Sequence, residues 1–168
     1  MPLYAVLDCA ADDALHGQAA RLEPYEARCL FFGKLDPVVK AASPHVVELA
    51  PGDPLTELWR TQGWSQNWGT WIESRSDLHK VWRRLRHFTQ AKLPSGEGPV
   101  LFRFWDPRVL RIYMPLIEPA ELSAWFQDID AYVWPPRTGG APSATASTAR
   151  PCRCRPAQRC RLTDPFET

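Results

Sequence analysis

Hydrophobic and polar positions alternate with two different periods before Pro135, and the change of period predicts where strands and helices lie. Short runs rich in β-branched and aromatic residues predict strands. These runs cover residues 3–7, 27–32, 45–49, 69–73, 100–105 and 131–134. The last of them is expected to close the sheet.

Between these runs, apolar residues recur at helical spacing behind residues that cap helices. Asp53-Pro54, Asp106-Pro107 and Glu118-Pro119 each predict a helix start, because Pro suits the first turn. The side chains of Asp53 and Asp106 can also accept from free N–H groups. A further helix over 76–90, capped by Ser76, has a buried stripe, and a short helix is expected over 11–20. The stripe comprises Leu78, Val81, Trp82, Leu85 and Phe88.

This order predicts an α/β fold, with α+β as the alternative: a mixed sheet of about five or six short strands flanked by helices. Residues 1–134 form the domain. Residues 135–168 are rich in Pro, Ala and Arg, and the stretch from Pro135 to Arg150 has too little apolar surface to offset the entropy of ordering. We therefore expect a disordered tail after the domain.

Composition changes this picture little. The 168 residues are 45% hydrophobic and 23% charged, values typical of globular proteins, and the formal net charge of +1 gives no strong field for nucleic acid or membrane. The sequence has no apolar run long enough to span a bilayer and no signal peptide pattern, which predicts a cytoplasmic protein. Cys9 and Cys29 lie in apolar segments typical of buried thiols.

Motifs for catalysis are absent: the sequence has no Gly-rich phosphate loop, nucleophile elbow or zinc-protease helix. His79 and His87 share a helix but are too far apart for one metal ion. We interpret Asp8, Asp12 and Asp13 as turn and cap residues. The tail cysteines, Cys152, Cys154 and Cys160, lack a nearby fourth ligand. We therefore expect no enzyme activity, cofactor or metal.

The predicted helix over 76–90 also carries a basic face, formed by Lys80, Arg83, Arg84 and Arg86. A solvated helix face is the simplest interpretation. An acidic protein partner would also fit its charge. Nucleic-acid binding by this helix and the Arg-rich tail is the alternative, although exposed aromatic residues are not evident.

Two aromatic segments remain. One, from Gly63 to Trp71, places three tryptophans among turn-forming residues. The other, from Phe102 to Leu110, runs from a strand into a helix, so alternation would put Phe102 and Phe104 on one face and Arg103 and Trp105 on the other. Asp106 would cap the helix and could pair with Arg103 or Arg108.

The segments Tyr4 to Asp8, Gly63 to Gly69 and Phe102 to Leu110 together resemble the adaptor or chaperone domain of bacterial type VI secretion effectors, known as domain of unknown function 4123. Protein-binding candidates come from these segments and from the basic helix. They are Trp64, Trp68, Trp71, Arg83, Arg84, Arg103, Trp105 and Arg108, with Phe102, Phe104, Asp106 and Pro107 as structural motif residues.

The resemblance implies a protein that binds a secreted toxin effector in the producing cell and helps to load it onto the valine-glycine repeat spike protein. No cofactor belongs to that role. Members of the family continue into a second, partly helical lobe, whereas this sequence turns to Pro-, Ala- and Arg-rich residues after Trp134. A truncated, non-functional member of the family is therefore a further hypothesis.

Overall fold

The computed structural model describes residues 2–11, 27–93, 95–96, 98–135 and 152–155. Its strands are β1 (Leu3–Asp8), β2 (Arg28–Cys29), β3 (Pro44–Leu49), β4 (Gly69–Glu73), β5 (Gln90–Lys92), β6 (Pro99–Leu101), β7 (Ala131–Trp134) and β8 (Cys152–Cys154). Its helices are α2 (Pro37–Ala42), α3 (Pro54–Leu58), the π-helical η2 (Trp59–Gly63), α4 (Trp64–Gln66), α5 (Leu78–Arg86), α6 (Pro107–Tyr113), the 3₁₀ turn η3 (Met114–Leu116) and α7 (Pro119–Trp125).

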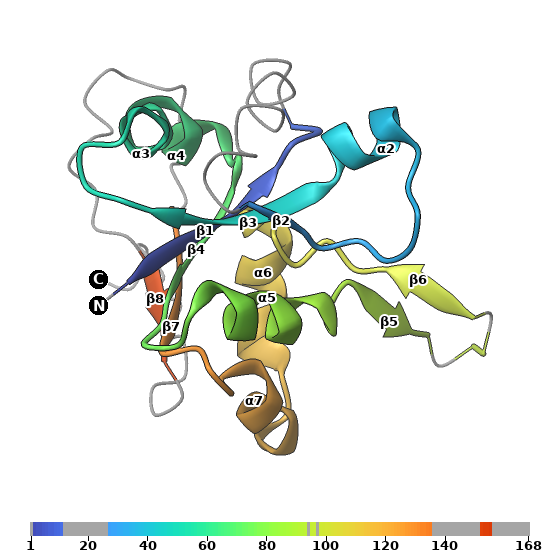
Figure 1. Cartoon of the computed structure of the whole chain (residues 1–168). Helices are drawn as coiled ribbons and strands as arrows, with labels where there is room; N and C mark the ends of the chain where they lie inside the picture. Colours follow the sequence, from blue (N-terminus) through green and yellow to red (C-terminus); the bar gives the residue numbers. More distant parts are fainter. Residues whose placement is uncertain (1, 12–26, 94, 97, 136–151, 156–168) are drawn as a thin grey trace.

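Six strands form one sheet in the order β2-β3-β1-β4-β7-β8, and β5 pairs with β6 in a separate hairpin (Figure 1). Within the described residues every pairing is antiparallel. The prediction of a sheet flanked by helices is confirmed. The expected mixture of parallel and antiparallel pairs is not found. The strands β3 and β4 run in the same direction and are joined through α3, η2 and α4, but β1 lies between them and pairs antiparallel with each.

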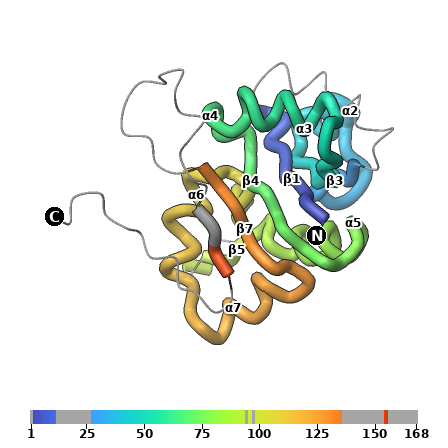
Figure 2. The backbone as a smooth tube through the Cα atoms, turned by 90° about the vertical axis from the view of Figure 1, so that its left-hand side faces the viewer, coloured from blue at the N-terminus to red at the C-terminus, as the bar shows by residue number. Residues whose placement is uncertain are grey.

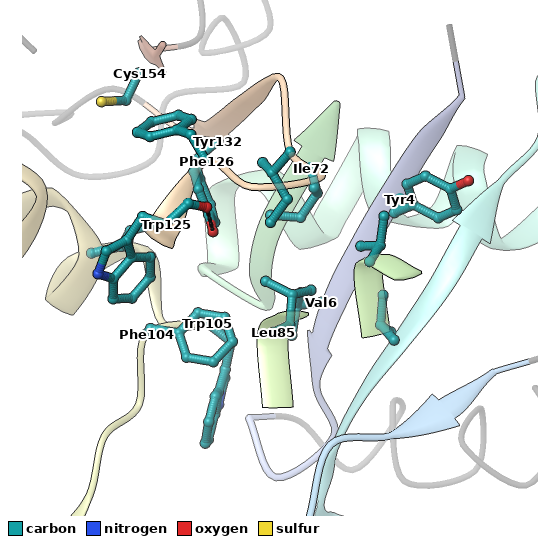
Figure 3. Packing of buried hydrophobic residues seen from close by; sticks show 14 of the residues in the cluster. Tyr4, Val6, Ile72, Leu85, Phe104, Trp105, Trp125, Phe126, Tyr132 and Cys154 are labelled. Carbon is teal, nitrogen blue, oxygen red and sulfur yellow. Dashed lines mark hydrogen bonds between the residues drawn. The ribbon is translucent and has the colours of Figure 1, made fainter. Parts of the chain in front are cut away.

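Helices cover both faces of the sheet, with α3 and α4 on one side and α5, α6 and α7 on the other (Figure 1). Successive residues of β1 therefore enter two different cores. Tyr4 and Val6 pack with the larger cluster, shown in part in Figure 3, whereas Ala5 and Leu7 pack against α3, η2 and Trp68. A strand buried on both faces explains why β1 reads as a continuous apolar run.

The predicted strands at 45–49, 69–73 and 131–134 are confirmed, as are the helix starts behind Asp53, Asp106 and Glu118. The helix expected from Ser76 to Gln90 is shorter. It is capped by Asp77, whose side chain accepts from the N–H of Lys80, and it ends at Arg86. Residues 90–92 instead form β5.

The strand expected over 100–105 is also shorter, because β6 ends at Leu101. The chain then turns, with the N–H of Phe104 donating to the carbonyl of Phe102 and that of Asp106 to the carbonyl of Arg103. The predicted alternation therefore fails: Phe104 and Trp105 are adjacent, yet both pack into the same larger core, with their rings in contact.

The strand expected over 27–32 contains only the two paired residues of β2. The helix expected over 11–20 lies outside the described residues, apart from Ala11. In the tail, residues 152–154 form β8 beside β7, where a disordered segment was expected (Figure 2). Within the described part of the chain, no helix is both long enough and apolar enough to cross a membrane.

Candidate functional site

Three sequence motifs meet at the end of β1. The N–H of Asp8 donates to the carbonyl of Trp68 over 2.7 Å, which joins the first motif to the tryptophan-rich motif. The hydroxyl of Thr70 in β4 donates to the carbonyl of Trp105 over 3.1 Å, which joins β4 to the third motif. Segments distant in sequence therefore form one local structure.

Two buried carboxylates and two arginines form the centre of this site. Arg103 donates from Nη2 to Oδ2 of Asp8 over 2.6 Å, and the same nitrogen lies 4.0 Å from Oδ2 of Asp106. Arg108 forms a bidentate ion pair with Asp106: its Nε donates to Oδ1 over 2.9 Å, and its Nη2 donates to Oδ2 over 2.8 Å. The predicted pairing of Asp106 with nearby arginines is confirmed.

Asp106 also caps α6, because its Oδ1 accepts from the backbone N–H of Arg108 over 2.9 Å. Burial raises the pKa of Asp106, but the hydrogen bonds and positive charge of Arg108, with the charge of Arg103, outweigh burial and leave that pKa below its ordinary value. The pKa of Arg108 is raised in turn by its bond to Asp106. The carboxylate therefore stays ionised and fixed.

This arrangement suits a scaffold better than acid–base chemistry, because each carboxylate is held by an arginine. The side chains of Asp8 and Asp106 are 6% and 7% exposed, whereas those of Arg103 and Arg108 are 47% and 67% exposed. The surface above the pair therefore presents fixed guanidinium groups rather than carboxylates. A rigid cationic edge of this kind can bind an anionic group of a partner.

The remaining residues of the third motif support it from within. Phe104 is fully buried and packs edge-on against Trp105 and Trp125. Phe102 is partly buried and contacts Tyr113 with the ring centroids 4.7 Å apart, and Pro107 is buried at the start of α6. Trp105 is 2% exposed and packs in the core, so its side chain offers little surface to a partner.

The tryptophan-rich motif lies on the opposite face of the sheet. Trp68 is 3% exposed and packs closely on Gly63. A Cβ at Gly63 would lie 2.5 Å from Cε3 of the Trp68 ring, so Trp68 also offers little surface to a partner. Trp64 and Trp71 are partly buried, with ring centroids 4.6 Å apart. Those two rings retain surface that a partner could touch.

The basic residues of α5 do not form a single free surface. Lys80 lies 3.6 Å from the carboxylate of Asp77, and Arg84 donates to the side chain of Gln127. Arg86 lies over the rings of Phe32 and Trp82, at 3.9 and 4.4 Å from their centroids. Arg83 is exposed. The structure thus divides the predicted basic face into residues with different contacts.

Sequence reasoning missed two relationships. Asp8 was interpreted as a turn residue, and its carboxylate does accept from the N–H of Ala10, but it also receives Arg103 from 95 positions away. No local pattern marks that pair. The stack of Arg86 on Phe32 was missed as well, since Phe32 follows a strand on a different segment.

Among the described residues, no group of three or more His, Cys, Asp or Glu side chains is arranged to hold a metal ion. Cys154 is buried in the larger core beside Tyr132, its partner in the β7–β8 register. The side chain of Cys152 and all of Cys160 lie outside the described part of the chain.

A family model described as "Domain of unknown function (DUF4123)" matches residues 3–124. The chain belongs to this family. The match begins in β1 and ends in α7, so all three motifs of the DUF4123 domain fall within it. Membership implies an adaptor role in type VI secretion in general. No curated protein and no solved structure matches the chain.

Proposed function

We propose that this DUF4123 protein is a cytoplasmic adaptor that binds a type VI secretion effector and assists its loading onto the valine-glycine repeat spike protein. The observation that carries the proposal is the family match over residues 3–124. The mechanism is binding and transfer, without a chemical reaction. The toxin effector and the spike are its two partners.

The geometry of the central site supports a binding role. Asp8 and Asp106 are each neutralised by an arginine, so their charges serve to fix Arg103 and Arg108 in place. Fixed arginines lose little conformational freedom when a partner binds, and arginine is among the residues that contribute most at protein interfaces. A rigid charged edge is thus suited to contact with another protein.

One observation supports a second candidate function, nucleic-acid binding. Phe32 is 55% exposed and lies beneath Arg86, which supplies the combination of exposed ring and cation that single strands use. However, Lys80 pairs with Asp77 and Arg84 bonds to Gln127, so fewer cations are available than the sequence indicated. We rank this function second.

Co-purification tests the proposal directly. The full chain would carry an affinity tag and be co-expressed with the product of each neighbouring gene, and the complexes would be washed at low and moderate salt. A stable complex with a toxin or spike protein at moderate salt is the expected result. A folded chain that captures neither protein, but retains nucleic acid at low salt only, would overturn the proposal in favour of the second candidate.

Two variants make the experiment specific. Phe88→Ala removes a ring stacked on Trp125 at a centroid distance of 3.9 Å, and serves as the folding-defective control. Reversal of charge at Arg83 and Arg84 probes the basic helix. Loss of nucleic acid with retention of the toxin in that variant would separate the two candidate functions.

A further inference from the structure

The outer face of α6 and η3 carries an exposed apolar stripe with an arginine at one end. Arg108, Ile112 and Leu116 recur four positions apart, which places them along one side of the helical segment. Their exposures are 67% for the side chain of Arg108, 70% for Ile112 and 71% for Leu116. Leu110 and Met114 are buried and attach the opposite side to the core.

This pattern differs from that of an ordinary surface helix. The exposed residues of α5 include His79, Lys80 and Arg83, which are the polar residues that water favours. Residues 107–116 contain no acidic residue, and their exposed positions include Ile112 and Leu116. Single exposed apolar residues are common, but two on one helical face beside a fixed charge form a defined surface.

Charge differs between the two ends of this stripe. At the first end, Arg108 is clamped by Asp106, and Arg103 lies between Asp106 and Asp8, so both guanidinium groups are held in position. At the other end, Glu118 lies two positions after the end of η3 and is exposed, and Glu121 is exposed in the first turn of α7. The surface is therefore cationic, then apolar, then acidic.

We propose that the α6–η3 stripe binds an amphipathic helix of the carried effector. Apolar residues of that helix, four positions apart, would pack on Ile112 and Leu116, and a carboxylate at one end would meet Arg103 and Arg108. The inference rests on the proposed adaptor function. It adds the surface used and the kind of segment bound.

A helix fits this surface better than a strand does. Strands bind by adding to the edge of a sheet, whereas α6 satisfies its backbone groups internally and offers only side chains. Rows of side chains four apart on one helix pack into the grooves between such rows on another. The stripe extends over about 12 Å, which corresponds to roughly two turns of a bound helix.

The stripe is tested by measuring the affinity of the purified full chain for the toxin encoded beside it, by titration calorimetry. The variant Ile112→Asp/Leu116→Asp is expected to bind at least tenfold more weakly. The matched control is Val38→Asp/Val39→Asp, since these residues are 72% and 48% exposed on α2, away from α6 (Figure 1). The control is expected to bind within twofold of the unmodified chain.

The cationic end is tested in the same way with Arg108→Ala against Arg60→Ala, an exposed arginine on η2 that also pairs with a carboxylate, that of Glu57. Weaker binding by the first variant alone is expected. Because loss of Arg108 also affects Asp106, urea unfolding would establish that the variant remains folded at the assay temperature. Hydrogen exchange should show protection over residues 107–116 in the complex.

The outcomes distinguish this surface from the general function. Equal binding by Ile112→Asp/Leu116→Asp and the unmodified chain would overturn the stripe while leaving the adaptor function in place. Failure of the unmodified chain to bind either neighbouring product would overturn the adaptor function and the stripe together. A dimer of this chain that the stripe variant abolishes would assign the surface to a second copy and also overturn the inference.

Discussion

The guanidinium of Arg103 lies 2.6 Å from the carboxylate of Asp8, measured from Nη2 to Oδ2, and so ties the end of β1 to the turn before α6. The carboxylate is almost fully buried, whereas the arginine is half exposed. Arg103 therefore neutralises the buried carboxylate of Asp8, and the rest of its guanidinium group remains exposed at the surface.

Arg103→Ala is expected to destabilise the fold, because the carboxylate of Asp8 would remain buried without its cation. Removal of one partner of a fully buried pair costs about 3–5 kcal/mol. Since Arg103 is half exposed and water can replace it in part, we expect about 1–2 kcal/mol. Urea unfolding followed by tryptophan fluorescence measures the change.

The double variant Asp8→Asn/Arg103→Ala is the matched control for that prediction. The neutral amide needs no cation, so the second substitution should cost less in the Asp8→Asn background than in the unmodified chain. Additive effects of the two substitutions would show that the two side chains do not interact in solution.

Gly69→Ala is expected to be among the most damaging single substitutions. Gly69 has φ of +153°, and a Cβ there would lie 1.8 Å from the carbonyl oxygen of Val6 in the neighbouring strand. Backbone cannot move aside as a flexible side chain can, so a loss of at least about 3 kcal/mol in unfolding free energy is expected.

Gly33→Ala provides the comparison for Gly69. Gly33 also has positive φ, at +85°, but nothing lies within 4 Å of the Cβ position. Only the left-handed conformation is then penalised, at about 1–2 kcal/mol. Thermal unfolding of both variants measures the contrast, and similar losses would count against the close approach of β1 and β4.

His45 should make stability depend on pH near neutrality. Burial lowers its pKa, the charge of Lys40 acts in the same direction, and the bond to the Ser43 carbonyl only partly opposes them. The unfolded state therefore binds a proton near pH 6.5 that the folded state does not. Unfolding free energy should fall as pH decreases from 7.5 to 5.5, by at most about 1.4 kcal/mol per pH unit.

The variant His45→Gln identifies the source of that dependence. Glutamine cannot bind the proton, so the slope between pH 7.5 and 5.5 should become flatter. Asp106 has a lowered pKa and contributes stability that is lost only as pH falls below about 4, so it does not interfere in this range. An unchanged slope in His45→Gln would assign the titration to another group.

Cys9 is expected to resist alkylation in the folded protein. Burial, with the charge of Asp8 and the nearby Cys29, raises the pKa of this thiol to about 12. Because the thiolate is the reactive form, alkylation by iodoacetamide at pH 8 should be at least about a hundredfold slower than in urea. Mass spectrometry of the peptides measures this, with the partly exposed Cys29 as the internal control. Equal rates in both conditions would show that the segment opens.

Most strands of this fold can be predicted from sequence because burial leaves a clear mark. β4 runs over the five residues that its apolar pattern indicates, and β1 and β3 differ from their patterns by one residue each. The strand predicted through Trp105 is wrong because the chain turns after β6 ends at Leu101. The sequence pattern does not distinguish a turn from a strand here, because either can bury adjacent aromatic residues in a protein with a core on each face of its sheet. Tertiary packing decides between them.

The central site was predictable only in its local part. Asp106 lies next to Pro107 and two positions from Arg108, so its capping and pairing follow from spacing. The bond between Asp8 and Arg103 depends on how β1 and the segment before α6 come together. The burial of Trp68 likewise depends on contact with Gly63 across the turn that ends α4.

The strand β8 limits where this protein can be shortened. Composition places a domain boundary after Trp134, yet β8 comes from beyond that point and covers the outer edge of β7. A chain that stopped at Trp134 would leave four consecutive uncharged, mostly bulky residues, Ala131, Tyr132, Val133 and Trp134, on an open strand. Such edges recruit other strands and lead to aggregation. Three residues of the tail thus cover the edge of β7 and move the outer edge of the sheet to β8, whose sequence Cys152-Arg153-Cys154 includes a charged residue.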